Sequence, residues 1–242
     1  MMINSRNNSK ILNVISYYEE ENIVRDRLFV NEGYINLLEC LKWGKVKEIY
    51  YTKKYIEEIQ KLDIESYLVS EDVMKKMSKM KNPCGLIFLS ETKTLNIKNP
   101  SKIIYLDDVQ DPGNVGTIIR TALAFNYDLV ILSPRCANMY NHKVLSASRG
   151  SVYKIDVIKD EFDNVIKTYP NHKIVSTTLS DDSVELDNFN IHKDFIVVFG
   201  NEGHGINESI INHSDYKIKI AMNEIDSLNV ALSAAIILHK LK

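Results

Sequence analysis

Five consecutive apolar residues at 195–199, FIVVF, constrain the fold of this 242-residue chain more than any other feature. A strand that is apolar at every position has both of its faces covered, which is typical of parallel sheets between layers of helices. Five more strand-like segments alternate with segments of helical period in the same half of the chain: IIYLDDV, DLVILS, VYKIDVI, HKIVSTTL and YKIKIAM. The pattern predicts an α/β fold, a mostly parallel sheet with helices on both faces.

A polar stretch at residues 90–102, SETKTLNIKNPSK, predicts a boundary between two domains. It lacks long apolar runs and contains a proline, as linkers often do. Four strand-like segments lie upstream: LFVNE, KEIYYT, SYLVS and GLIFLS. The segment at 34–44 has apolar residues at helical spacing, namely Ile35, Leu37, Leu38 and Leu41. We therefore expect a smaller α/β domain at residues 1–95 before a larger one at residues 96–242.

Charge and composition exclude several classes of protein. The net charge of −2 argues against a protein that coats nucleic acid by bulk electrostatics. The longest apolar runs are far shorter than the roughly 20 residues of a membrane-spanning helix, and the N-terminus MMINSRNNSK lacks the apolar core of a secretion signal. Three cysteines without the spacing of a disulfide framework fit a reducing compartment. We expect a cytoplasmic protein with no membrane segment.

One local basic run, MKKMSKMK at residues 74–81, is a candidate for contacts with phosphates. Its four lysines would supply the positive charge that the chain as a whole lacks. The commoner explanation of such a run is a solvated helix face. Both interpretations stay open at this point.

Three unusual loops follow strands of the predicted sheet, at the edge where ligands of open α/β sheets bind. The first, DPGNVG at 111–116, has two glycines that allow unusual backbone conformations, and it leads into the helical segment TIIRTALAF. The second, GNEGHGI at 200–206, exposes backbone groups at three glycines but lacks the Lys and Ser/Thr of a phosphate-binding loop. The third, NEIDSLN at 223–229, precedes an alanine-rich helical segment.

Each loop also has a simpler explanation when it is considered alone. Arg120 lies away from the apolar side of its helix and would then form a surface ion pair. The glycines would form ordinary turns. Ser227 and Asn229 would cap the helix that follows them.

Taken in order, the segments DPGNVGTIIRTALAF, FIVVFGNEGHGI and IKIAMNEIDSLNVALSAAI resemble the three motifs of the SpoU/TrmH class of SPOUT RNA 2′-O-ribose methyltransferases. The resemblance covers residues 103–241. Upstream, RDRLFVNEG at 25–33 is similar to the basic-then-FVxEG signature of the substrate-binding domain that precedes many members. Family members often have glycine where Asn126 ends the first motif's helix, and asparagine also tolerates the left-handed conformation expected there.

The resemblance implies that residues 96–242 form a SPOUT catalytic domain with a deep trefoil knot at its C-terminus, and that residues 1–95 bind the RNA substrate. It implies a homodimer whose active site is completed across the interface. The implied reaction moves a methyl group from S-adenosylmethionine to a ribose 2′-hydroxyl of structured RNA. A separate folded N-terminal domain favours ribosomal RNA over transfer RNA as the substrate. Two alternatives stay open: a transfer RNA 2′-O-methyltransferase, and a non-catalytic RNA-binding or ribosome-assembly factor on the same fold.

Carried over position by position, the resemblance implies three groups of site residues. The catalytic group comprises Asn114, Arg120, Glu202, Ser227 and Asn229. The cofactor-binding group comprises Leu179, Gly200, Asn201, Gly203, Ile220, Met222 and Leu228. The RNA-binding group comprises Arg25, Arg27, Lys75, Lys76 and Lys79.

The resemblance also places Arg120 beside the reacting hydroxyl or its adjacent phosphate. Because an arginine normally stays protonated, electrostatic activation of the oxygen is favoured over proton abstraction, and the proton acceptor stays open. The histidines outside the second loop lack metal-ligand spacing, and Asp107 and Asp108 are interpreted as strand-end residues. We therefore expect no metal site.

Overall fold

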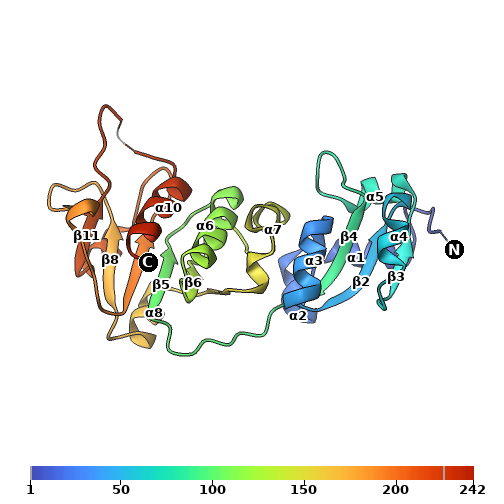
Figure 1. The fold of residues 1–242 in the computed structure, drawn as a ribbon, viewed down its shortest axis with the longest axis horizontal. Helices are drawn as coiled ribbons and strands as arrows, with labels where there is room; N and C mark the ends of the chain where they lie inside the picture. Colours follow the sequence, from blue (N-terminus) through green and yellow to red (C-terminus); the bar gives the residue numbers. More distant parts are fainter. Residues whose placement is uncertain (1, 226) are drawn as a thin grey trace. The chain divides into compact units, whose positions relative to one another are not determined.

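The computed structural model describes residues 2–225 and 227–242, so Asp226 of the third loop lies outside the described residues. The chain forms two compact units, one of Met1–Thr94 with Tyr140–Tyr153 and one of Leu95–Met139 with Lys154–Lys242 (Figure 1). The segment Tyr140–Tyr153, which the sequence assigned to the second domain, thus packs with the first unit. The functions assigned to the two domains stay predictions. Within the described residues, no helix is long and apolar enough to span a bilayer.

The first unit is built on a four-stranded sheet in the order β1-β4-β2-β3. β4 runs antiparallel to both β1 and β2, and β2 pairs with β3 in parallel. The four upstream strands predicted from the sequence are confirmed: β1 (Leu28–Glu32), β2 (Val46–Tyr51), β3 (Ser66–Leu68) and β4 (Leu86–Glu91). The helices of this unit are α1 (Ser9–Ser16), α2 (Glu20–Asp26), α3 (Tyr34–Trp43), α4 (Ile56–Ile59), α5 (Glu71–Met77) and α7 (His142–Ser148).

The helix predicted at 34–44 is confirmed as α3, but the apolar spacing does not identify its buried face. Ile35 and Leu38 are 55% and 48% exposed, whereas Leu37 and Cys40 are fully buried. The reason lies in Asn36, whose Nδ2 donates to Asn31 Oδ1 at 3.1 Å and to the backbone oxygen of Glu32 at 2.9 Å. These hydrogen bonds fix the rotation of the helix, since a buried amide requires such partners.

The buried carboxylate of Glu32, at the end of β1, binds Ser78 and Lys79 of the basic run at residues 74–81. Glu32 is 8% exposed. Its Oε1 accepts from the Tyr18 hydroxyl at 3.0 Å and the Lys79 backbone N–H at 2.9 Å, and its Oε2 accepts from the Ser78 hydroxyl at 2.5 Å. Burial, together with the charge of Glu32, raises the pKa of Tyr18. The three donors compensate for the loss of water around the carboxylate.

Replacing Glu32 with glutamine should therefore destabilise the first unit. The substitution leaves one of three donors without a good acceptor and removes the charge that strengthens all three bonds, so we expect a loss of roughly 1–3 kcal/mol in the free energy of unfolding. Urea denaturation of the whole chain measures it. The matched control is Glu91→Gln, which removes an ion pair with Lys45 on a more exposed carboxylate and should cost at most about 1 kcal/mol. Equal effects of the two substitutions would contradict this role of Glu32.

The second unit contains a seven-stranded sheet in the order β7-β6-β5-β10-β8-β11-β9, in which every neighbouring pair is parallel. The FIVVF segment is the central strand and is buried throughout. All six predicted strands are present, although β7 begins only after the short helical turn Ser151–Tyr153, and β9 was not predicted. The strands are β5 (Lys102–Leu106), β6 (Leu129–Leu132), β7 (Asp156–Lys159), β8 (Lys173–Thr177), β9 (Val184–Glu185), β10 (Phe195–Phe199) and β11 (Tyr216–Lys219).

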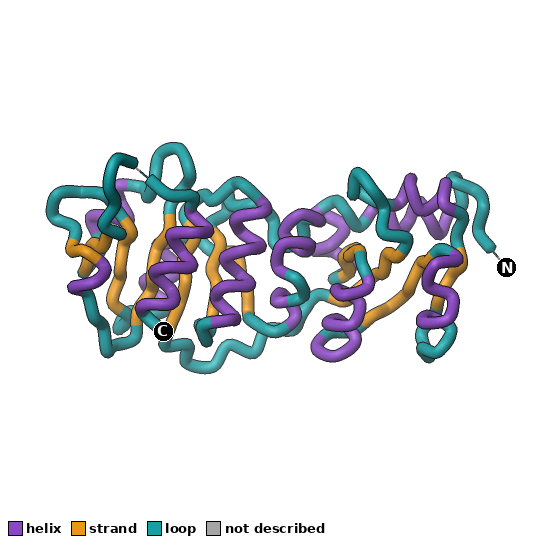
Figure 2. The backbone as a smooth tube through the Cα atoms, turned by 45° about the horizontal axis from the view of Figure 1, so that its top comes forward, coloured by secondary structure: helices purple, strands orange, loops and turns teal. Residues whose placement is uncertain are grey.

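Helices cover both faces of this sheet (Figures 1 and 2). On one face, α8 (Phe162–Thr168) and α9 (Glu208–Asn212) pack on the alternate residues of β5, β6 and β10. On the other face lie α6 (Pro112–Ala124) and α10 (Val230–Lys240), which contact each other. Asn126, beyond the end of α6, has φ of 57°, as the sequence predicted. The predicted α/β fold class is confirmed, and the trefoil knot stays a prediction.

Candidate functional site

The candidate site lies where β10, β8 and β11 end side by side. Because these neighbouring strands are parallel, the loops that follow them meet at one edge of the sheet. A cavity of about 560 Å³ lies between these loops and the start of α10. All seven predicted cofactor-binding residues line it: Leu179, Gly200, Asn201, Gly203, Ile220, Met222 and Leu228. Three predicted catalytic residues also line it: Glu202, Ser227 and Asn229.

Several lining residues were missed by the sequence analysis, namely Thr177, Thr178, Val230, Ser233 and Ile237. The two threonines lie at the end of β8, and the others belong to α10. No loop signal marks them, because they sit in or beside ordinary strand and helix segments. In the sheet, β8 lies between β10 and β11, so its end lies between theirs, and this order is a property of the fold.

The glycine-rich loop after β10 closes on itself. The backbone groups of Asn201 and Gly205 exchange two hydrogen bonds of 3.0 Å, and Gly205 has φ of +73°. A Cβ atom at Gly200 would lie 2.2 Å from the carbonyl carbon of Gly205 and 2.3 Å from the nitrogen of Ile206. Both are backbone atoms, so no side-chain rotation relieves the overlap. The close approach requires glycine at position 200.

The side chain of Asn201 organises the same loop. Its Nδ2 donates to the backbone oxygen of Asp108 at 2.8 Å, which ties the loop to the segment after β5. Its Oδ1 accepts from the backbone N–H of Gly203 at 2.7 Å. The predicted cofactor-binding Asn201 therefore uses its side-chain amide to shape the cavity wall.

A chain of hydrogen bonds joins one residue from each of the three motifs. Asn229 Nδ2 donates to Asn114 Oδ1 at 3.0 Å, and Asn114 Nδ2 donates to Glu202 Oε1 at 2.8 Å. The three residues belong to segments that are far apart in sequence. The fold thus assembles three of the predicted catalytic side chains into one polar group at the cavity.

Asn114 owes its position to the first turn of α6, where the sequence predicted an open loop. That prediction is wrong: DPGNVG is helical from Pro112, and neither of its glycines has positive φ. Asp111 is the N-cap and accepts from the backbone N–H of Asn114 at 2.9 Å, while Pro112 occupies the first turn, where its missing N–H has no consequence. A capped helix end is a firmer support for Asn114 than a glycine loop.

Asn229 is the N-cap of α10, as the simpler explanation proposed. Its Oδ1 accepts from the backbone N–H groups of Ala231 at 2.9 Å and Leu232 at 3.3 Å. The same side chain contacts Asn114 through Nδ2. Capping and participation in the polar group are therefore compatible, because the two ends of the amide serve different partners.

Two substitutions at Asn229 should separate these contributions. Asn229→Asp keeps a capping oxygen and removes the donor to Asn114, so thermal stability should stay near that of the unchanged protein. Asn229→Ala removes both, and should cost about 1 kcal/mol of stability. If the contact with Asn114 matters for turnover, both variants lose at least about ten-fold in catalytic rate, roughly 1.4 kcal/mol. Thermal melts and rate assays on the two variants check this, and full activity of Asn229→Asp would assign Asn229 to capping alone.

Arg120 is not brought to the cavity of its own chain. It lies on the exposed side of α6, six positions beyond Asn114, which is about 9 Å along the helix axis. Its guanidinium makes no hydrogen bond or ion pair with any residue that the structure describes, so the surface ion pair considered for it is not found among those residues. Its assigned catalytic role stays a prediction.

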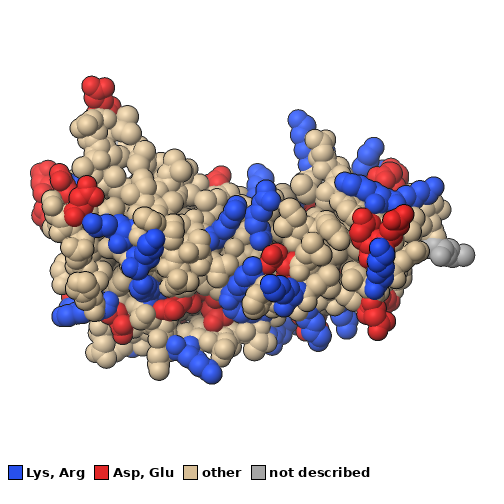
Figure 3. All heavy atoms as spheres, viewed as in Figure 1, with Lys and Arg blue, Asp and Glu red and all other residues tan. Residues whose placement is uncertain are grey.

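The candidate RNA-binding residues lie in the first unit. Lys75 and Lys76 occupy the last turn of α5, whose Met74 and Met77 are buried in the core. The helix ends at Met77, so Lys79 lies in the segment that follows it, and only the first half of the basic run is a helix face. Arg25 pairs with Asp26 at 2.7 Å, and Arg27 Nε donates to Thr92 Oγ1 at 3.4 Å. Figure 3 shows basic and acidic groups interspersed on the visible face. Their binding of RNA stays a prediction.

Asp107 and Asp108 lie at the end of β5, where the sequence placed them. Asp107 is 6% exposed and accepts from the backbone N–H of Asn207 at 2.7 Å, and burial raises its pKa. Asp108 is 5% exposed and accepts from the Ser133 hydroxyl at 2.7 Å. Both carboxylates hold loops in place. Among residues 2–225 and 227–242, no three His, Cys, Asp or Glu side chains come together in a group that could hold a metal ion, and the absence of a metal stays a prediction.

Comparisons with known proteins show which family and which folds this chain resembles. Residues 101–239 match the model of the SpoU rRNA Methylase family. The 23S rRNA (guanosine(2553)-2′-O)-methyltransferase RlmP of Bacillus subtilis is 27% identical over 245 residues, covering 99% of this chain and 98% of that protein. A crystal structure of an RNA 2′-O ribose methyltransferase matches with a TM-score of 0.84 and 26% identity, covering 99% and 97% of the two chains. The AdoMet-bound rRNA methyltransferase from Sinorhizobium meliloti, at 23% identity and a TM-score of 0.86, covers 99% and 96% and shares the fold.

Proposed function

This chain belongs to the SpoU rRNA methylase family, and from that premise we propose that it transfers the methyl group of S-adenosylmethionine to a ribose 2′-hydroxyl of RNA. Ribosomal RNA is the proposed substrate, because the relative from Bacillus subtilis, matched over nearly its whole length, acts on 23S rRNA. The observation that carries the proposal is the hydrogen-bonded group of Asn114, Glu202 and Asn229 at the 560 Å³ cavity.

The cavity fits the cofactor in the chemistry of its walls. Leu179, Met222 and Leu228 supply apolar surface for an adenine ring, and Gly200 allows close approach to the backbone. Glu202 is the one carboxylate among the described residues that line the cavity, and it supplies negative charge for a cationic sulfonium. When bound, S-adenosylmethionine supplies an activated methyl group.

The side chains of the polar group would orient the reacting ribose. A ribose hydroxyl is a weak nucleophile, so transfer depends on holding its oxygen in line and favouring loss of its proton. Asn114 and Asn229 hold each other and Glu202 through two hydrogen bonds, which keeps all three side chains in fixed positions. Preorganised polar groups of this kind lower the barrier because they need no rearrangement during the reaction.

We further propose that the active protein is a homodimer. Arg120 lies outside the cavity of its own chain, and a second copy would allow it to reach the partner's site. Leu232 and Ile236, one turn apart on α10, are 58% and 44% exposed and provide an apolar stripe for such an interface. Arg120 would then stabilise negative charge that develops on the ribose oxygen.

Transfer of tritium-labelled methyl groups tests the proposed function. The protein is incubated with labelled S-adenosylmethionine and either protein-free ribosomal RNA or transfer RNA. Label in the ribosomal RNA is the expected result. Label in transfer RNA alone would establish the transfer RNA alternative, and RNA binding without transfer to either substrate would establish the non-catalytic alternative.

A further inference from the structure

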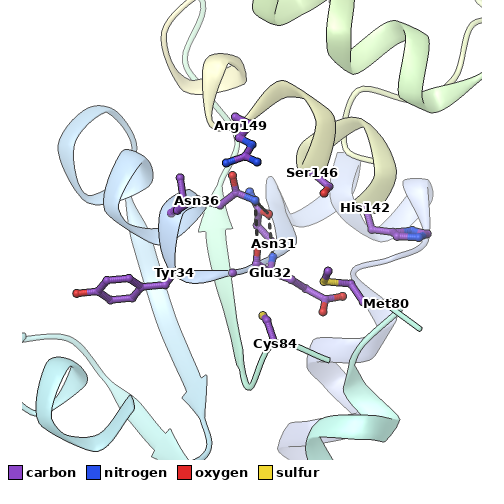
Figure 4. A pocket seen from close by; sticks show the side chains of 11 residues that line it. Asn31, Glu32, Tyr34, Asn36, Met80, Cys84, His142, Ser146 and Arg149 are labelled. Carbon is purple, nitrogen blue, oxygen red and sulfur yellow. Dashed lines mark hydrogen bonds between the residues drawn. The ribbon is translucent and has the colours of Figure 1, made fainter. Parts of the chain in front are cut away.

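The first unit contains a cavity of its own, separate from the methyl-transfer cavity. Its volume is about 270 Å³, close to the lower limit of roughly 300 Å³ for ligand pockets. In Figure 4, Arg149 and Ser146 lie above the Asn31 and Glu32 pair, His142 and Met80 lie to its right, and Cys84 lies below it. All of its lining residues belong to this unit.

A buried amide in this cavity has an unused acceptor. Asn36 is 9% exposed, and its Nδ2 already donates to Asn31 Oδ1 and to the Glu32 backbone oxygen. Among the described residues, none donates to its Oδ1. This oxygen is open to solvent in the cavity, so a ligand there can donate a hydrogen bond to it in place of water.

The charges around the cavity favour a neutral group inside and an anion outside. The Glu32 carboxylate lines the cavity and is buried, so it repels a phosphate. Burial also lowers the pKa of His142, which leaves its ring neutral near pH 7. Arg149 is exposed, points toward the Asn31 and Asn36 group in Figure 4, and makes no hydrogen bond or ion pair within the described residues.

A nucleobase has the required chemistry. It carries neutral hydrogen-bond donors on its edge and flat apolar faces, and it is joined to a phosphate that stays outside. Met80 and Ile35 line the cavity and are 40% and 55% exposed, so they offer apolar surface against such faces. RNA-binding proteins commonly read unpaired bases that are turned out of a loop and bound by hydrogen bonds and apolar contacts.

We infer that the cavity lined by Asn36, Ser146 and Arg149 binds one unpaired base of the RNA substrate, with Arg149 contacting the adjoining phosphate. This inference rests on the proposed function, because it assumes that RNA is the substrate. The first unit would then make a specific contact with RNA, in addition to the contacts predicted for the lysines of the basic run.

Binding of short RNAs to the full chain tests the inference. The probes are a single-stranded RNA oligomer that contains all four bases and an abasic oligomer of equal length. Ser146→Leu places a larger side chain in the cavity from an exposed helix position. Arg149→Asn removes the charge at a residue with φ of 50°, a conformation that asparagine tolerates. Lys143→Asn is the matched control, since it makes the same charge change on α7 at a residue that does not line the cavity.

The unchanged protein should bind the four-base oligomer at least about ten-fold more tightly than the abasic one, a difference of roughly 1.4 kcal/mol. Ser146→Leu should abolish this preference, Arg149→Asn should weaken binding of both oligomers, and Lys143→Asn should change neither by more than about two-fold. Equal binding of the two oligomers by the unchanged protein, or an undiminished preference in Ser146→Leu, would overturn the inference. Methyl transfer to ribosomal RNA is measured in parallel, so that its absence identifies a failure of the proposed function instead.

Discussion

Replacement of Gly200 with alanine is expected to weaken cofactor binding strongly and to reduce methyl transfer with it. The added Cβ would lie 2.2 Å and 2.3 Å from backbone atoms of Gly205 and Ile206, so the loop has to move. The loop forms one wall of the cavity, and its movement displaces Asn201 and Glu202 together. We expect the affinity for S-adenosylmethionine to fall at least about 100-fold, roughly 2.7 kcal/mol, by isothermal titration calorimetry.

Gly203→Ala is the matched control in the same loop. A Cβ atom there would meet the Asn201 side-chain oxygen at 3.3 Å and no backbone atom, so a small adjustment accommodates it. Its cofactor affinity should stay within about ten-fold of the unchanged protein, a difference of at most 1.4 kcal/mol. If the two variants bind the cofactor equally well, the loop is not the wall of the cofactor site.

Replacement of Arg120 with alanine is expected to reduce methyl transfer by about 100-fold to 1,000-fold, as loss of one preorganised electrostatic group does. Cofactor affinity should stay within about two-fold, because Arg120 does not line the cavity of its own chain. Single-turnover rates and calorimetry measure the two quantities separately. A variant with an unchanged rate would remove Arg120 from the mechanism.

Mixed dimers locate the site at which Arg120 acts. A mixture of Arg120→Ala and Gly200→Ala chains contains dimers with one intact cavity and one intact arginine, on different chains. If Arg120 acts across the interface, half of the dimers regain one of two sites, and the mixture recovers about a quarter of the unchanged activity. If Arg120 acts within its own chain, mixing restores nothing.

The apolar pattern predicted the strands of the second unit, because a strand that is buried on both faces is apolar at nearly every position. β10 is apolar at all five positions and lies in the centre of a parallel sheet. β9 has two exposed residues and no such pattern, which is why it was missed. The burial of α3 was not predictable from apolar spacing, since hydrogen bonds of Asn36 determine which face meets the sheet.

The residues of the candidate site were predictable as separate motifs, but their geometry was not. Asn114, Glu202 and Asn229 were each named from sequence, and their hydrogen bonds join positions 88 and 115 residues apart. Asp111 caps the first turn of α6 at residues where the sequence predicted a glycine loop. The Asp111 cap is a local contact, with the backbone N–H of Asn114 three residues later. The hydrogen bonds of the site depend on tertiary partners, which a local pattern does not contain. The grouping of Tyr140–Tyr153 with the first unit is of the same kind.

The position of the transferred methyl group shows whether this chain methylates ribose. Ribosomal RNA treated with the protein and isotopically labelled S-adenosylmethionine is digested to nucleosides, which are separated and identified by mass spectrometry. The proposed function predicts that the label resides on the ribose of a 2′-O-methylnucleoside, with far less of that product from Gly200→Ala. Label on a nucleobase, or a 2′-O-methylnucleoside formed equally by Gly200→Ala, would contradict it.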